Sequence, residues 1–404
     1  MSVITLVEQL QEVDDPRCAG KVGHHLGDIL VIAVCAVIAC AESWEDIALY
    51  GRSKQAWLES FLELPFGIPS HDTFRRVFML IDPDRFEAAF LSWVRGLTQD
   101  FVREVVAIDG KTIRGSFDRG REQSPLHMIS AWASEQNLVL GQRCVEGKSN
   151  EITAIPALLD ALELRNSIVT LDAMGCQTAI AARILDRGAD YLLALKGNHG
   201  QAHKAVAEHF ARTCFDVGSA TAAVHDSFDD THGRLVRRRI FASTEAASLP
   251  PLAGSPGLQS VLAVETIRSV NGLTSTTADI RYFVCSGDDT PEMLGQAIRK
   301  HWTIENSLHW VLDVTFREDH SRVRDRTAVR NLAILRKIAL NLINRDTASR
   351  DSKKGRRKQA GWNDTYMRKL LTLTTHQFHP DAHKGGIGCL NWSSRTMRRT
   401  PRVN

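Results

Sequence analysis

Residues 105–110 read Val-Val-Ala-Ile-Asp-Gly, and residues 168–172 read Ile-Val-Thr-Leu-Asp. Both runs are short, β-branched and apolar, which predicts two buried strands that end at Asp109 and Asp172. Ligand sites of α/β sheets lie at the carboxyl ends of strands, so the two carboxylates meet if the strands are neighbours. An aspartate after a strand is also a common turn residue, and each aspartate alone therefore indicates little.

The elements around these strands predict the fold class. Period-two runs predict strands at residues 105–109, 126–133, 138–145, 168–172 and 191–195, and helical spacing predicts helices at residues 151–162 and 178–187. The order is three strands, a helix, a strand, a helix and a strand. This is the order of a ribonuclease-H-like mixed sheet flanked by helices, although other α/β sheets fit the same pattern.

Three regions are predicted along the chain. Residues 1–103 show helical spacing with proline breaks, which predicts an N-terminal helical domain that either binds DNA or caps the next domain. Residues 104–345 predict the α/β domain, with a β-rich insertion at about 215–288 followed by a helix from Pro291. Residues 346–404 are basic at first and then lack any period, which predicts a basic linker and a C-terminal tail.

Composition excludes several classes of protein. The 404 residues are 43% apolar and 24% charged, which excludes a disordered, collagenous or membrane-embedded chain. The most apolar stretch, residues 29–41, is too short to span a bilayer and predicts a core helix. Eight cysteines without a CxxC pair are typical of reduced thiols, and no signal peptide is visible, so we expect a cytoplasmic protein.

Charge is unevenly distributed along the chain. The formal net charge is only +3, but residues 317–404 hold 21 Lys and Arg against 7 Asp and Glu. An asymmetry of this size indicates a polyanionic partner, and nucleic acid is the usual polyanion.

A third carboxylate, Glu305, lies on the helix predicted from Pro291, beside an apolar stripe. Two strand-end aspartates and a later glutamate supply hard oxygen ligands, which suit Mg²⁺ or Mn²⁺. Two such ions can activate a water or hydroxyl and stabilise the leaving 3′ oxygen in phosphoryl transfer. His301 and His309, four residues on either side of Glu305, also suggest zinc, but a helix drifts over two turns and no further ligand is evident. We therefore interpret both histidines as structural.

Seven blocks occur in order along the chain: VAIDGKTIRGS (106–116), NEITAIP (150–156), TLDAMGCQ (170–177), ALKGN (194–198), HWTIEN (301–306), HWVLDV (309–314) and NLA (331–333). In this order they resemble the DDE transposases of the ISAs, H-repeat-associated family. The resemblance spans roughly residues 15–372, and it implies that Asp109, Asp172 and Glu305 are the catalytic metal-binding triad of a ribonuclease-H-like fold. In the wider superfamily Tyr, Arg and Lys often frame the Glu, whereas Ile298, His301 and Leu312 stand at those places here.

The resemblance also implies an activity and its partners. A transposase of this family cuts DNA at the ends of its insertion sequence and transfers the strands into target DNA, with Mg²⁺ (or Mn²⁺) as cofactor and two ions expected. Its partners are double-stranded DNA, as terminal inverted repeats and as target, and no membrane. Because two ends must be brought together, we expect a homodimer at least on DNA, associated with the nucleoid.

Basic residues near these positions are candidates for phosphate contacts. Three follow predicted strand ends, three alternate along the insertion, and two follow the helix of Glu305; ordinary surface charge is the alternative for each. They are Lys111, Arg114 and Lys196, then Arg234, Arg237 and Arg239, and finally Arg322 and Arg324.

Two alternatives to a transposase stay open at this point. A catalytically degenerate or domesticated copy would bind DNA without cutting it, but all three acids of the triad are present. A structure-specific nuclease on the same fold would cut DNA and yield no joined products.

Overall fold

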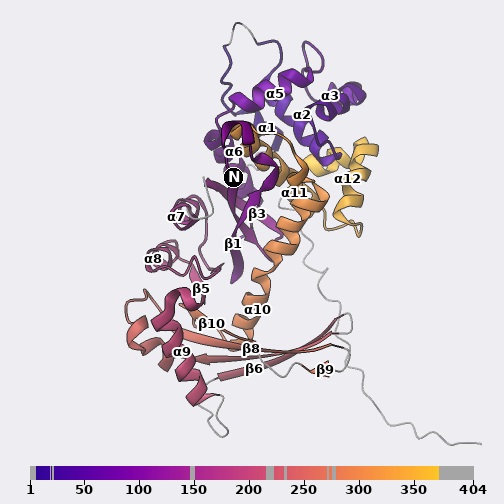
Figure 1. Cartoon of the computed structure of the whole chain (residues 1–404). Coiled ribbons are helices and arrows are strands. Elements are labelled where there is room, and N and C mark those ends of the chain that lie inside the picture. The colour runs from indigo at the N-terminus through magenta and orange to yellow at the C-terminus, as the bar shows by residue number, and fades with distance from the viewer. Residues whose placement is uncertain are drawn as a thin grey trace, which may run out of the picture.

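The computed structural model describes residues 6–18, 20, 22–145, 151–214, 223–231, 234–270, 273–274 and 279–372. One mixed β-sheet occupies the middle and lower parts of the view in Figure 1, and a group of helices lies above it. A long helix, α11 (Arg326–Arg345), lies between the sheet and these helices and contacts both. Helix α11, which is distant in sequence from the N-terminal helices, therefore joins those helices to the sheet.

Five strands form the part of the sheet that carries the two aspartates. They are β1 (Glu104–Ile113), β2 (Leu126–Ala133), β3 (Leu138–Val145), β4 (Ser167–Leu171) and β5 (Asp190–Leu195). Their spatial order is β3-β2-β1-β4-β5; β1, β2 and β3 are antiparallel, and β4 and β5 run parallel to β1. Helix α7 (Glu151–Ala161) precedes β4, and α8 (Thr178–Asp186) precedes β5. The predicted ribonuclease-H-like order is confirmed.

The β-rich insertion extends this same sheet. It begins with a helix that the sequence pattern did not predict, α9 (Gly200–Thr213), so it starts before residue 215. Strand β10 pairs antiparallel with β5, and the sheet continues through β8 and β7 to β6. Short β9 (Leu273–Thr274) pairs with β8. The inserted strands are β6 (Ala223–Thr231), β7 (Arg234–Ser243), β8 (Ser260–Val270) and β10 (Asp279–Cys285).

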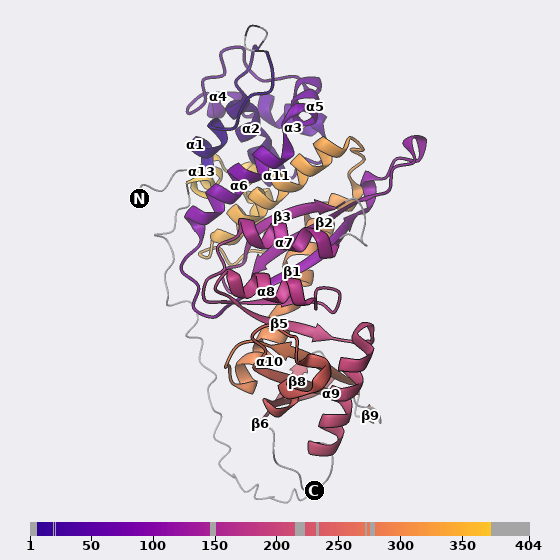
Figure 2. The same cartoon turned by 90° about the vertical axis from the view of Figure 1, so that its left-hand side faces the viewer.

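Helices cover both faces of the inserted strands. The ring of Phe210 in α9 stacks on Tyr282 of β10, 6.1 Å between centroids. On the other face, α10 (Pro291–His301) packs Leu294 against Ile240 and its neighbours, and it approaches so closely that a Cβ on Gly295 would collide with Ile240. Figure 2 shows α9 running along one side of these strands. Because side chains alternate along a strand, the residues of the inserted strands that face α10 lie on the opposite face from Tyr282, which contacts α9.

The N-terminal helices share their hydrophobic core with the sheet domain. Every residue of α2 is buried, as predicted for the apolar run, and among the described residues no helix has the length and apolar character to cross a bilayer. Asn331 of α11 donates from Nδ2 to the carbonyls of Phe78 and Ile81, 2.9 Å each, which ties the two parts together. These helices are α1 (Leu6–Gln11), α2 (Leu26–Ile38), α3 (Trp44–Ser53), α4 (Gln55–Leu58), α5 (His71–Leu80) and α6 (Pro83–Leu97).

The prediction of a linker and tail from residue 346 is wrong for the residues up to Leu371. Two helices, α12 (Lys353–Trp362) and α13 (Asp364–Leu371), lie beside α2 and α11. Arg357 of the supposedly flexible basic run is 3% exposed, donates to the carbonyl of Val37 at 2.8 Å and stacks over Phe316. Its guanidinium donates hydrogen bonds to the backbone carbonyls of Thr315 and Val37 instead of facing solvent. Residues 373–404 lie outside the described residues.

Candidate active site

Two parallel strands bring Asp109 and Asp172 to the same level of the sheet. The β1–β4 pairing runs from Glu104 opposite Ser167 to Ala107 opposite Thr170, and each aspartate lies two residues beyond that last pair. β1 continues past Asp109 to Ile113 because β2 still pairs with it. Asp109 therefore lies within its strand, and the prediction that it ends the strand is wrong.

Asp172 directly follows β4 and is held by the turn that begins there. Its Oδ1 accepts the backbone N–H of Met174 at 2.9 Å. Three residues on, a Cβ at Gly175 would lie 2.8 Å from the Cβ of Leu171, so the turn folds back closely onto the strand. Local backbone geometry thus orients this carboxylate.

Glu305 lies on a π-helical segment, η8 (Ile304–His309), that continues the direction of α10. The regular helix predicted to about residue 316 ends at His301, and the Thr303 hydroxyl donates to the carbonyl of Lys300 at 2.6 Å. A side chain bonded to the backbone in this way disturbs the helical ladder, and π-helical turns are frequent at functional sites. Glu305 lies at the rim of the packed face, with its side chain 51% exposed.

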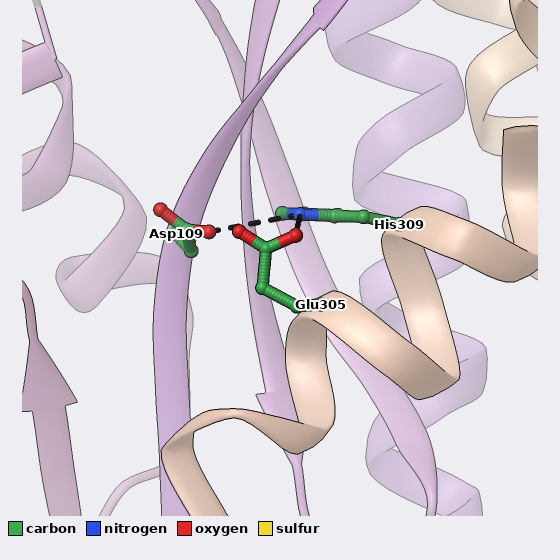
Figure 3. A group of neighbouring side chains, drawn as sticks. All are labelled: Asp109, Glu305 and His309. Carbon is green, nitrogen blue, oxygen red and sulfur yellow. Dashed lines mark ion pairs between the residues drawn. The ribbon is translucent and has the colours of Figure 1, made fainter. Parts of the chain in front are cut away.

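Three side chains from two elements converge at this point. Figure 3 shows Asp109 on β1, with Glu305 and His309 on the segment that crosses it. His309 Nδ1 lies 3.5 Å from Glu305 Oε2 and 3.6 Å from Asp109 Oδ2. One ligand atom from each side chain lies within 4.8 Å of the other two, a spacing that fits coordination of one cation.

The electrostatics of this group reflect two carboxylates held close together. Burial raises the pKa of Asp109 to about 6, and the neighbouring Glu305 adds to that effect. The hydrogen bond from His309 lowers the pKa of Glu305. Positive charge between the carboxylates would stabilise both in their ionised forms.

Asp109, Asp172 and Glu305 all line one cavity of about 800 Å³. The cavity continues over the inserted strands on the side covered by α10, and it is lined there by residues of β6, β7, β8 and β10. Half-exposed Trp302 lies in its wall beside Glu305. Five cations line it as well: Lys196, Arg238, Arg268, Arg281 and Arg299.

The sequence spacing that suggested zinc does not assemble as one ligand set. His301 Nδ1 is hydrogen-bonded to the hydroxyl of Thr170 at 2.8 Å, so its interpretation as a structural histidine is supported. His309 is different, because its Nδ1 faces the carboxylates of Asp109 and Glu305. The third member of the possible ligand set is therefore Asp109 and not His301. The sequence predicted a structural role for His309, since only the tertiary structure brings Asp109 of β1 beside it.

Comparison with known proteins identifies the family. The family described as "Transposase DDE domain" matches residues 100–342, and "DDE_Tnp_1-associated" matches residues 7–94. The chain belongs to the DDE transposases. "Putative transposase YncI" of Escherichia coli O157:H7 is 40% identical over 376 residues, which cover 92% of this chain and 95% of that protein. "H repeat-associated putative transposase YhhI" of Escherichia coli strain K12 is 36% identical over 377 residues, covering 92% and 98%.

These matches confirm the predicted resemblance to the H-repeat-associated type. The chain is a DNA transposase, an enzyme that cuts DNA and transfers strands with the help of divalent metal ions. The β-rich insertion lies before Glu305, as the strand pattern predicted.

Lys111, one of the residues predicted to contact DNA, is buried in this transposase. Its side chain is 9% exposed, and Nζ lies 2.7 Å from Asp313, 2.9 Å from Glu318 and 3.4 Å from Asp319. These acids raise the pKa of Lys111 although burial opposes its charge. A lysine so enclosed cannot reach a phosphate, and we therefore correct its prediction from a DNA contact to an internal ion pair.

The inserted arginines are divided between the two faces of β7. Arg237 and Arg239 are ion-paired with Asp226 and Glu265 and lie on the face opposite Arg238, which lines the cavity. The period-two spacing of a strand places them so. The sequence predicted that basic residues alternate along this strand, but it did not indicate which face of the strand lines the active-site cavity. Arg234 begins β7, and His232 and Gly233 before it lie outside the described residues.

The remaining predicted contacts lie on the surface of the transposase. Lys196 is exposed and lines the cavity. The side chain of Arg114 is 83% exposed, 3.6 Å from Asp319. Arg322 is exposed, and Arg324 lies 3.9 Å from Asp118 with its side chain 53% exposed. Arg268, Arg281 and Arg299 were missed because their spacing carries no signal without the strand pairing.

Proposed function

We propose that Asp109, Asp172 and Glu305 hold the metal ions with which this transposase cleaves and joins DNA. The supporting observation is the convergence of Asp109 and Glu305 at one point, with Asp172 lining the same cavity. Carboxylate oxygens suit Mg²⁺ or Mn²⁺, and two ions fit three acids arranged in this way. When bound, such ions activate the attacking hydroxyl and stabilise the leaving 3′ oxygen.

The side chains themselves have distinct tasks in this proposal. Asp109, on the strand that β2 keeps extended, would hold a metal ion together with Glu305. Asp172 is oriented by the N–H of Met174, so it can bind an ion without moving its backbone. Glu305 comes from the helical segment after α10, and in the metal-free protein a hydrogen bond from His309 lowers its pKa.

DNA follows the cationic lining of the cavity to these acids. Lys196, Arg281 and Arg268 lie along it on the face of the sheet that α10 covers. Such contacts hold phosphates without reading the DNA sequence. Each phosphate that a basic side chain neutralises makes the affinity for DNA depend more steeply on salt concentration. Arg114, Arg322 and Arg324 are proposed to extend this surface beyond the cavity.

The substrate is proposed to be the pair of terminal inverted repeats of the element that encodes the transposase, followed by target DNA. Joining two ends to one target requires two active sites, which favours a homodimer on DNA. The N-terminal helices present exposed Arg75 and Arg76 on α5, a surface suited to recognition of the repeats. This activity takes place where the chromosome lies, in the cytoplasm at the nucleoid.

Substitution of Asp172 tests the assignment of the triad. A labelled duplex carrying the repeats that flank the gene is incubated with Mg²⁺ and the transposase or its Asp172→Asn variant. We expect the variant to bind the ends and to lose cleavage by at least a hundredfold, since preorganised charge is a large part of such catalysis. Asp186→Asn, an exposed aspartate on α8, is the matched control and should cleave normally.

The products distinguish a transposase from a nuclease. We expect joined strands in a plasmid target with the unsubstituted protein. Cleavage by Asp172→Asn at the rate of the unsubstituted protein would refute the triad, and cuts without joined products would refute strand transfer at this site.

A further inference from the structure

We propose that His309 is itself a ligand of the metal ion held by Asp109 and Glu305, so that this site combines two carboxylates with an imidazole nitrogen. The inference rests on the proposed function and names a residue that the triad does not include. It follows from the position, burial and hydrogen bonding of His309, taken in turn.

His309 is aimed into the group formed by the two acids. Nδ1 is nearly equidistant from Glu305 Oε2 and Asp109 Oδ2, at 3.5 and 3.6 Å. An ion that contacts all three atoms would lie between the three side chains, which Figure 3 shows pointing toward one another. The ring stands on the same π-helical segment as Glu305, so both ligands move as one unit relative to β1.

Burial restricts what else the ring could do. His309 is 5% exposed, so it is held in place by packing and cannot turn away into solvent. Its nearest polar neighbours at Nδ1 are carboxylates, which accept hydrogen bonds and cannot donate them. The ring nitrogen on that side must therefore either donate a proton to the acids or give its lone pair to a cation.

The surroundings of the other ring nitrogen, Nε2, are compatible with binding of a cation by the lone pair of Nδ1. Nε2 is buried and has no hydrogen-bond partner within the part of the chain that the structure describes. No hydrogen-bond partner at Nε2 therefore dictates which ring nitrogen carries the proton. With the proton on Nε2, Nδ1 presents its lone pair to the ion, which is the neutral tautomer that metals require.

His301 shows what a structural histidine looks like in the same cavity. Its Nδ1 is engaged by the hydroxyl of Thr170 at 2.8 Å, and it falls outside the group of three ligand atoms. It lies four residues before Glu305, as His309 lies four residues after it. His301 is therefore a matched control for the loss of an imidazole near the site.

A nitrogen ligand changes which metal the site prefers. Mg²⁺ favours oxygen ligands, whereas Mn²⁺ and Zn²⁺ accept imidazole more readily. We therefore expect the transposase to bind Mn²⁺ more tightly than Mg²⁺, and replacement of His309 to weaken Mn²⁺ binding more than Mg²⁺ binding.

Electron paramagnetic resonance of Mn²⁺ tests the assignment without any reaction. The full chain, free of DNA, is titrated with Mn²⁺, and the bound ion is examined by pulsed methods for coupling to ¹⁴N. We expect coupling from a directly bonded nitrogen both in the unsubstituted protein and in His301→Gln. When the histidines are labelled with ¹⁵N, this coupling should change from ¹⁴N to ¹⁵N. In His309→Gln we expect the coupling to vanish and Mn²⁺ affinity to fall about tenfold or more.

Each outcome bears on a different claim. If Mn²⁺ binds but shows no nitrogen coupling, or if the coupling persists in His309→Gln, the ligand assignment is overturned and the carboxylate triad stands. If Asp109→Asn binds Mn²⁺ as well as the unsubstituted protein, the proposed metal site itself is wrong. Circular dichroism and a second variant, His309→Asp, separate loss of the ligand from loss of the fold, because the aspartate restores metal binding without nitrogen coupling.

Discussion

Replacement of Lys111 by methionine should destabilise this transposase substantially. Lys111 lies on β1 two residues after Asp109, and its ammonium joins three acids that follow the segment of Glu305. Burial alone would raise the pKa of Glu318, but Lys111, Arg336 and Lys337 together lower it from 4.5 to about 2. This buried cluster therefore connects β1, which carries Asp109, to the residues that follow the segment of Glu305.

The magnitude follows from the pKa of Glu318. One pKa unit corresponds to about 1.36 kcal/mol, so the lowering is worth about 3 kcal/mol of interaction in the folded state. Lys111 has the largest attractive effect of the three cations, and its loss leaves Glu318 2% exposed with less compensation. We expect Lys111→Met to lower the free energy of unfolding by about 2–3 kcal/mol, near the range for a broken buried pair.

Urea denaturation followed by circular dichroism measures this loss. A double-mutant cycle with Glu318→Gln isolates the interaction of the pair, and Lys111→Arg keeps the charge. Lys54→Met is the matched control, since its partner Asp364 is 40% exposed and such a pair contributes about 1 kcal/mol at most. A coupling energy no larger than about 0.5 kcal/mol, or unchanged stability with weakened DNA binding, would refute this reasoning and restore Lys111 as a phosphate contact.

Two further predictions concern pH and DNA binding. Because the pKa of Glu318 is lowered in the folded state, its contribution to stability is complete above about pH 4.5 and is lost as the pH falls toward 2, so unfolding measured across that range should depend on pH less steeply in Glu318→Gln. Lys196→Ala should weaken DNA binding and reduce the slope of log affinity against log salt by about 1, while Arg237→Ala, paired with Asp226 on the opposite face, should leave the slope nearly unchanged; equal slopes for both variants would contradict the proposed path of DNA.

Local pattern was sufficient for the order of elements. The strands β1 to β5 and the helices α7 and α8 occur where period and composition predicted them, because alternation and helical spacing depend on neighbours in sequence. The apolar run of α2 predicted a buried helix for the same reason. Register then follows from parallel pairing, which places Asp109 and Asp172 at one level.

The roles of individual charged residues depended on contacts between distant segments. Lys111 follows a strand residue of the triad and is basic, which predicted a phosphate contact. In the structure its ammonium is paired with Glu318, which lies 207 residues after it in the sequence. The basic run forms the helix α12, and Arg357 in that helix is buried and donates to the carbonyl of Val37, 320 residues away. Electrostatic interactions of this kind depend on position and burial, which no local window of sequence contains.

What the sequence by itself determined is the ribonuclease-H-like order of strands and helices, the family, and the three acids proposed as the triad. Only the tertiary structure decided that the insertion extends the same sheet, that Arg238 and not Arg237 faces the cavity, and that His309 joins Asp109 and Glu305. The physical reason is that backbone periodicity acts between residues close in sequence, whereas burial and charge pairing act between whichever side chains the fold brings together.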